Sequence, residues 1–152
     1  KWVKQSIHYW CPDTKEHKFL GQNVTVAILD TGISPHPDFK GRILSFRDFS
    51  STTVSSEKVL FSFSHFSPLI DNSGHGTHVA GILAGSGLLS SGTYAGIAPF
   101  CNLIIGKVLD QNGNGSIKNV INGIQWIRDI YTQFHIRIIN ISVGTRPDLS
   151  IH

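Results

Sequence analysis

Charged residues are scarce in this chain, since Asp, Glu, Lys and Arg make up only 15% of its 152 residues while apolar residues make up 40%. That balance excludes a disordered acidic or basic tail and predicts one globular domain. The 13 Lys and Arg residues are scattered singly, without the basic run that binding to a phosphate backbone needs. We therefore expect no nucleic-acid partner.

Long apolar runs and cysteine pairs are also missing. No apolar run approaches the roughly 20 residues that cross a bilayer, and the first ten residues lack the apolar stretch of a signal peptide. We expect no membrane partner, and the compartment, secreted or cytoplasmic, stays open. Cys11 and Cys101 lie far apart without a CxxC pair, which argues against a structural zinc site and favours two free thiols over a disulfide.

Three near-continuous apolar runs predict buried strands, and they cover residues 23–30, 102–109 and 136–143. Such runs are typical of parallel strands that are covered on both faces. A helix is predicted between the last two runs, because Ser116 is a good N-cap and apolar residues follow at three- and four-residue steps: Ile117, Val120, Ile121, Ile124, Ile127 and Ile130. A second helix is predicted from about Thr77 to Ala84. This alternation predicts an α/β fold with a parallel, doubly wound sheet and helices on both faces.

The domain organisation follows from these elements. Residues 1–22 form a polar lead-in segment, and residues 23–152 form the predicted domain. Within it, residues 48–74 are rich in Ser, Thr and Phe and have no helical period, so we expect a long loop or an irregular hairpin there.

Asp30 ends the first predicted strand and is followed by Thr31 and Gly32. A carboxylate at the carboxyl end of a parallel strand lies where α/β folds usually place their sites. Asp-Thr-Gly is also a common turn, in which the carboxylate only binds a neighbouring backbone amide. This motif alone therefore leaves a functional and a structural interpretation open.

The segment 71–81 (DNSGHGTHVAG) is more specific, and its His75 is expected just before the second helix. The positive end of a helix dipole opposes protonation of a histidine, whereas a nearby carboxylate stabilises the imidazolium and holds the ring in one tautomer. Asp30 is the candidate for that carboxylate. Two alternatives stay open: His75 and His78 are ordinary polar residues, or they bind zinc, although no third ligand is obvious.

Both segments resemble the Asp and His motifs of subtilisin-like serine proteases. The matching stretches are 26–32 (VAILDTG), 36–38 (HPD), 75–81 (HGTHVAG), 96–99 (GIAP), 107–109 (KVL), 113–115 (GNG) and 139–144 (INISVG). They cover residues 24–144 in the family's own order, with Asp before His. The resemblance implies that Asp30 is the acid of a Ser/His/Asp triad, that His75 is the general base, and that His78 is a structural, interior histidine. From this paired match we expect Asp30 within hydrogen-bond reach of His75.

The resemblance also implies a polypeptide substrate and, where one exists, the protein's own propeptide as a partner. It places two backbone segments beside an extended substrate peptide: Gly113, Asn114 and Gly115, and Ser142, Val143 and Gly144. Main-chain hydrogen bonds to both sides of a strand-like ligand suit many sequences, and glycines let the ligand backbone come close.

Two parts of the family pattern are missing from the 152 residues: the Gly-Thr-Ser motif that carries the nucleophile, and the oxyanion Asn. Ser86 lies in a loop and Ser116 is better explained as a helix cap. We therefore expect the first half of a catalytic domain, inactive alone, because loss of the nucleophile removes most of the catalysis of a triad. Its last predicted strand should lack part of its burial at Ile138, Ile139 and Ile141.

The chemistry implied by the resemblance needs no cofactor. Many relatives bind structural calcium through the Asp of His-Pro-Asp together with a loop after the His helix. Asp38 is present, but residues 86–94 contain no carboxylate and no Asn, so the sequence lends a calcium site little support.

Two other functions compete with that of a subtilisin-like endopeptidase. Aspartic proteases also carry Asp-Thr-Gly after apolar residues, but they predict an all-β domain and leave HGTHVAG unexplained. A truncated, catalytically inactive relative could instead act as a peptide-binding module through residues 113–115 and 142–144.

Overall fold

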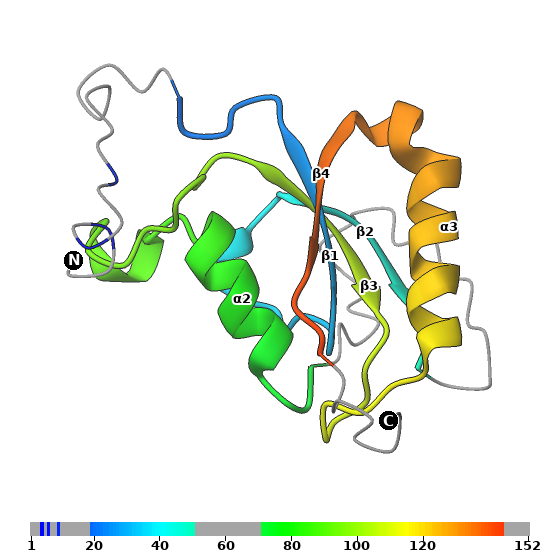
Figure 1. The fold of residues 1–152 in the computed structure, drawn as a ribbon. Coiled ribbons are helices and arrows are strands. Elements are labelled where there is room, and N and C mark those ends of the chain that lie inside the picture. Colours follow the sequence, from blue (N-terminus) through cyan, green and yellow to red (C-terminus); the bar gives the residue numbers. More distant parts are fainter. Residues whose placement is uncertain (1–3, 5, 7–8, 10–18, 51–70, 145–152) are drawn as a thin grey trace.

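A parallel sheet of four strands forms the centre of the described part of the chain, which comprises residues 4, 6, 9, 19–50 and 71–144 of a computed structural model (Figure 1). The strand order is β2-β3-β1-β4. The strands are β1 (Thr25–Asp30), β2 (Ile43–Asp48), β3 (Asn102–Lys107) and β4 (Ile136–Ile141). The helices are α2 (His75–Ala84) and α3 (Ile117–Phe134), with short 3-10 turns η2 (Pro37–Phe39) and η3 (Leu88–Ser90). The predicted α/β architecture is confirmed.

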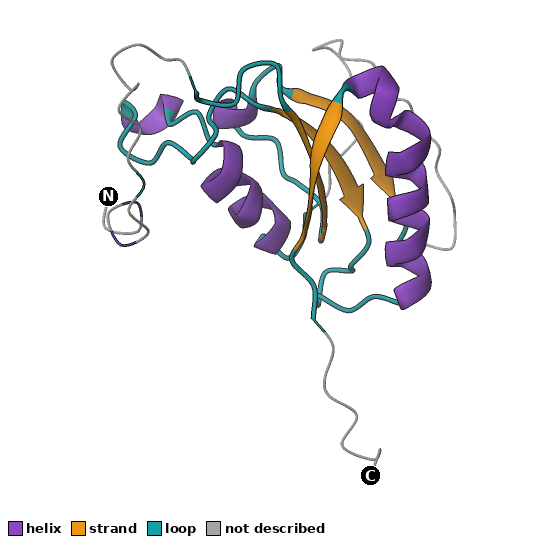
Figure 2. Cartoon of the chain, turned by 45° about the horizontal axis from the view of Figure 1, so that its top comes forward, coloured by secondary structure: helices purple, strands orange, loops and turns teal. Residues whose placement is uncertain are grey.

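The helices α2 and α3 cover opposite faces of the sheet (Figure 2). Alternate residues of a strand point to opposite faces, and β1 shows the consequence. Val26 and Ile28 pack in the cluster that contains Ala80 of α2, whereas Ala27 and Leu29 pack in the cluster that contains Ile127 of α3. All six residues of β1 are buried, as its continuous apolar run predicts.

The strand β2 was not predicted. Only Ile43 is buried in β2, and its other five residues, among them Ser45 and Arg47, are half-buried. β2 pairs with β3 alone among the described strands, so its mixed composition is that of an edge strand, which has a weaker sequence signal than a buried one. The predicted loop or hairpin over 48–74 lies mostly outside the described residues.

The helix α2 begins at His75, two residues earlier than predicted, so His75 is its first residue. Its buried residues are Gly76, Ala80 and Ala84, whereas the apolar side chain of Ile82 is exposed. The small residues face the sheet because they let the helix axis come close to β1.

The helix α3 begins after Ser116, whose hydroxyl accepts a hydrogen bond from the Asn119 N–H at 3.1 Å, as expected of an N-cap. The predicted apolar stripe is only partly correct, since Ile127 is buried while Ile117, Ile121 and Ile124 are exposed. Gly123 faces the sheet instead, and a Cβ there would lie 3.0 Å from Leu29 Cδ2. None of the described helices is long and apolar enough to cross a membrane.

The strand β4 lies at the other edge of the described sheet, paired with β1. Ile138, Ile139 and Ile141 are 53%, 42% and 41% exposed, which confirms the expected loss of burial. Apolar surface gains about 25 cal/mol per Å² when it leaves water, and an open strand edge offers free backbone donors and acceptors. This edge is therefore a template for association.

We expect the 152-residue chain, expressed alone, to self-associate through β4. Sedimentation velocity should show concentration-dependent species, and Ile138→Lys should reduce them because a charge blocks the edge. Ile117→Lys is the matched control, since Ile117 is 79% exposed on α3 and away from the sheet edge. A monodisperse monomer with a sharp, cooperative thermal transition would contradict this expectation.

Candidate active site

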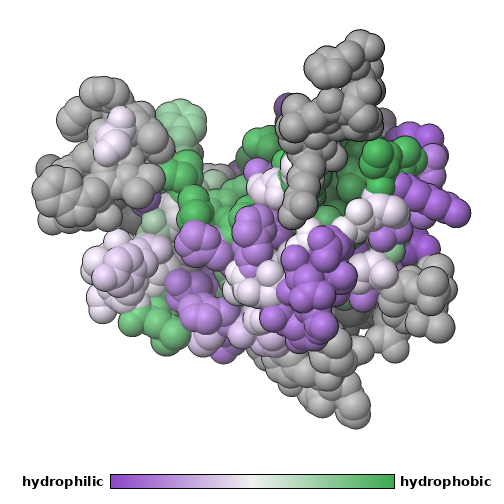
Figure 3. All heavy atoms as spheres, turned by 60° about the horizontal axis from the view of Figure 1, so that its bottom comes forward, coloured by the Kyte–Doolittle hydropathy of each residue, from purple (hydrophilic) through white to green (hydrophobic). Residues whose placement is uncertain are grey.

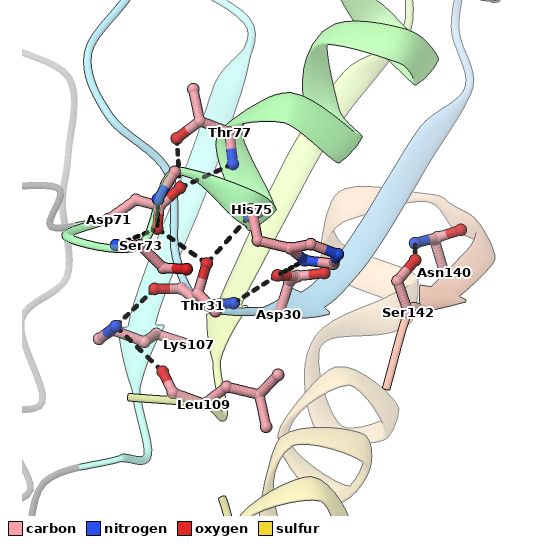
Figure 4. A network of polar contacts seen from close by, with 12 residues as sticks. Asp30, Thr31, Asp71, Ser73, His75, Thr77, Lys107, Leu109, Asn140 and Ser142 are labelled. Carbon is pink, nitrogen blue, oxygen red and sulfur yellow. Dashed lines mark hydrogen bonds and ion pairs between the residues drawn. The ribbon is translucent and has the colours of Figure 1, made fainter. Parts of the chain in front are cut away.

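Asp30 and His75 meet at the carboxyl edge of the sheet, where β1 ends and α2 begins (Figure 4). His75 Nδ1 lies 2.7 Å from Asp30 Oδ1, although 45 residues separate the two in sequence. This confirms the predicted hydrogen-bond reach. The Asp30 side chain is fully buried, whereas the His75 side chain is 52% exposed. The imidazole therefore connects a buried carboxylate to the surface.

Backbone contacts hold the two residues in place. The Thr31 N–H donates to Asp30 Oδ1 at 2.7 Å, so the carboxylate is fixed within its own turn. The next residue of α2 is Gly76, and a Cβ at that position would lie 2.2 Å from the Gly32 carbonyl oxygen. Only glycine therefore lets the first turn of α2 approach the end of β1 as closely as the contact between Asp30 and His75 requires.

The neighbouring carboxylates favour the charged form of His75. The hydrogen bond with Asp30 is the largest cause that raises the pKa of His75, and the charge of Asp30 adds to it. Partial burial acts in the opposite direction, and the charge of Asp71 contributes a further increase. A base paired in this way accepts a proton more readily than a free imidazole.

The two predicted substrate-binding segments leave the same edge of the sheet. Residues 113–115 follow β3 and residues 142–144 follow β4, and these strands flank β1 on its two sides. Apart from the half-buried Val143, these six residues are exposed. Figure 3 brings this edge forward and shows hydrophilic side chains gathered across its middle. The structure thus brings all eight predicted site residues to one edge.

Each segment has its own local support. Asp110 Oδ1 accepts hydrogen bonds from the N–H groups of Asn112 at 2.8 Å and Asn114 at 2.9 Å, and Gly113 adopts a φ of +77°, which favours glycine. Asn140 Nδ2 donates to the Ser142 hydroxyl at 2.8 Å (Figure 4). The turn after β3 is therefore built by Asp110, a residue that sequence reasoning missed.

His78 does not have the predicted interior position. It lies on an exposed face of α2, and its backbone N–H bonds to the Gly74 carbonyl within the first turn. Residues 75 and 78 are three positions apart, yet only His75 faces the end of β1. The described residues contain no group of three or more His, Cys, Asp or Glu side chains that could hold a metal ion.

Among the described residues, those around Asp38 do not fit a calcium ion. Asp38 Oδ2 accepts the Gly87 N–H at 3.1 Å and Oδ1 accepts the Leu89 N–H at 3.2 Å. The loop after α2 therefore presents hydrogen-bond donors to this carboxylate, whereas calcium needs several oxygen ligands. Arg42 also donates to the backbone carbonyls of Asp38 and Ala84, and so ties the same region to the end of α2.

Cys101 is a free, buried cysteine, and burial raises the pKa of its thiol. Cys11, the other cysteine, lies outside the described residues.

The comparisons with known proteins agree with this geometry. The profile of the subtilase family matches residues 21–150. The chain belongs to the subtilase family. The α/β fold also overturns the aspartic-protease alternative, which predicted an all-β domain.

Curated relatives of this subtilase chain include several bacterial proteases. It is 44% identical over 106 residues to serine protease AprX of Bacillus subtilis, a match that covers 70% of this chain and 21% of AprX. It is 42% identical over 126 residues to a thermostable alkaline protease of Halalkalibacterium halodurans, a match that covers 83% of this chain and 29% of that protease. With subtilisin E of Bacillus subtilis the identity is 37% over 134 residues, covering 88% and 30%. The chain thus spans less than a third of the length of these relatives.

Solved structures show the same likeness. The CspB protease of Clostridium perfringens superimposes with a TM-score of 0.75 at 27% identity, covering 91% of this chain and 32% of that protease. A cold-adapted subtilisin-like serine proteinase gives a TM-score of 0.54 at 32% identity, covering 74% and 34%.

Proposed function

We propose that this chain supplies the acid and the general base of a serine endopeptidase that cleaves peptide bonds through an acyl-enzyme. The observation that carries the proposal is the 2.7 Å contact between the buried Asp30 and the half-exposed His75. Membership of the subtilase family and the likeness to several proteases support it. The nucleophilic Ser and the oxyanion Asn are assigned to the part of the relatives that this chain does not span.

In the proposed mechanism His75 moves one proton in each step. Its Nδ1 is held by Asp30, so the ring nitrogen Nε2 accepts the proton of the nucleophilic serine as the serine oxygen attacks the scissile carbonyl. The same proton then passes to the leaving amine as the C–N bond breaks. Water completes the cycle by hydrolysing the ester, again with His75 as base. Asp30 stabilises the imidazolium that forms in each step.

An extended polypeptide is the proposed substrate. Residues 113–115 and 142–144, all exposed except the half-buried Val143, follow β3 and β4 on the two sides of the strand that carries Asp30. Backbone groups in these positions can form main-chain hydrogen bonds to both sides of a strand-like peptide. The fold also requires glycine at position 115, because a Cβ there would lie 2.5 Å from the Val108 carbonyl oxygen.

The test compares two products of one gene. We expect the protein translated from the complete reading frame to hydrolyse a casein-type substrate and to react with a serine-directed fluorophosphonate, whereas the purified 152-residue chain does neither. Turnover by the 152-residue chain that disappears in His75→Ala would reveal a nucleophile within it and contradict the assignment. A complete product that binds peptides without cleaving them would establish a binding module instead.

A further inference from the structure

We infer that Asp71 is a positioning residue that holds the first turn of α2 against the end of β1, so that His75 keeps its orientation toward Asp30. The inference rests on the proposed function, because it assigns Asp71 a part in the same site. Asp71 does not touch the reacting atoms in this geometry. It acts through the elements that carry the acid and the base.

The Asp71 carboxylate accepts five hydrogen bonds, although the residue lies in a loop. Its Oδ1 accepts the Thr31 hydroxyl at 2.8 Å, the Gly74 N–H at 2.9 Å and the Ser73 N–H at 3.2 Å. Its Oδ2 accepts the Thr77 N–H at 2.8 Å and the Thr77 hydroxyl at 2.5 Å. Burial raises the pKa of Asp71, but the hydrogen bonds from Thr77, Thr31 and Gly74 bring it below its ordinary value. The carboxylate therefore stays ionised at neutral pH.

These bonds replace a missing helix cap. The N-cap of α2 is Gly74, which has no side chain to accept a backbone N–H. Asp71 accepts the N–H groups of Gly74 and Thr77 from outside the helix, and its negative charge lies at the positive end of the helix dipole. The φ of Gly74 is +83°, a left-handed backbone conformation that residues with a side chain rarely adopt. A residue with a capping side chain is therefore disfavoured at this position.

Thr31 extends the network from Asp71 to both halves of the site (Figure 4). Its hydroxyl donates to Asp71 and accepts the N–H of Gly76 at 2.9 Å, the residue after His75. Its own N–H donates to Asp30 Oδ1. A continuous chain of hydrogen bonds thus runs from Asp71 to the acid and to the backbone beside the base.

The charge of Asp71 acts on His75 as well as on the helix end, so its removal has an effect that loss of an uncharged cap would not have. The charge of Asp71 raises the pKa of His75, in the same direction as Asp30. The other charged side chain in this network is Lys107 of β3, whose Nζ donates to the carbonyls of Thr31 and Leu109 and makes no hydrogen bond to Asp71 among the described contacts. Removing the Asp71 charge should therefore lower the pKa of His75.

The test is Asp71→Asn in the complete protein, which keeps the size of the side chain and removes its charge. We expect kcat to fall about 10- to 100-fold through misplacement of His75, with KM little changed. The acidic limb of the kcat/KM profile should move to lower pH, because a lower pKa frees the base earlier. The same shift should be seen in an NMR titration of the His75 ring, which needs no activity.

Two further variants keep the inference falsifiable. Asp38→Asn is the matched control, because that carboxylate also accepts two backbone N–H groups but lies at the far end of α2. It should reduce stability and leave the titration of His75 unchanged. Thr31→Val removes the hydroxyl that joins Asp71 to the Gly76 N–H but keeps the Asp71 charge. We therefore expect kcat to fall while the pKa of His75 shifts less than in Asp71→Asn.

The outcomes separate this inference from the proposed function. An active wild-type protein whose kcat and His75 titration are unchanged by Asp71→Asn would overturn the inference alone. A wild-type protein without peptidase activity would overturn the proposed function, and the NMR titration would still decide the positional role of Asp71.

Discussion

His75→Ala in the complete protein is expected to lower kcat by about 10⁶-fold, the size of the loss measured for removal of the histidine in subtilisin itself. The reason is that no other described side chain occupies the position beside Asp30, so the serine would lose its base. Asp30→Asn should cost about 10⁴-fold, because the base remains but its tautomer is no longer held. Initial rates on a chromogenic peptide, measured at high enzyme concentration, give both values.

The double variant and a neighbouring histidine provide the controls. Asp30 acts through His75, so Asp30→Asn combined with His75→Ala should be no slower than His75→Ala alone. His78→Ala should retain activity within about twofold, because His78 is exposed and one turn away from the pair. Additive losses in the double variant, or a large loss in His78→Ala, would refute the assigned pair.

Gly76→Ala should destabilise the protein by about 1–3 kcal/mol or more and separate His75 from Asp30. The added Cβ would lie 2.2 Å from the Gly32 carbonyl oxygen, 3.1 Å from the Gly32 nitrogen and 3.2 Å from the Asp30 Cβ. Two of these three neighbours are backbone atoms, so relief of the clash requires α2 to move away from β1. Equilibrium denaturation of the complete protein measures the change in the free energy of unfolding.

Gly81→Ala is the matched control for this prediction, since it makes the same substitution in the same helix. A Cβ at Gly81 would meet nothing within 4 Å. Alanine has the higher helix propensity, so this variant should be more stable by roughly 0.5–1 kcal/mol. Equal effects of the two substitutions would show that α2 can shift freely and that close packing at Gly76 does not hold the site.

The local pattern of residues was sufficient to place three of the strands. β1, β3 and β4 are rich in branched apolar residues, which favour strands, so their positions were predicted to within two residues. Burial did not follow from composition alone, because β1 is fully buried whereas most of β4 is exposed at the edge of the described sheet. The motifs around Asp30 and His75 likewise carried the site, because the chemistry of a carboxylate supporting an imidazole needs those residue types. Their proximity across 45 residues came from the resemblance to a known family, and not from any local pattern.

Tertiary contacts decided what the pattern left open. The face that a helix buries depends on how closely its backbone approaches the sheet, so Gly76, Ala80 and Gly123 face inward while Ile82 and Ile117 remain exposed. β2 is held by its pairing with β3, a long-range contact that its mixed composition does not reveal. The role inferred for Asp71 also depends on distance, since its five hydrogen bonds join a strand end to a helix start that only the folded chain brings together.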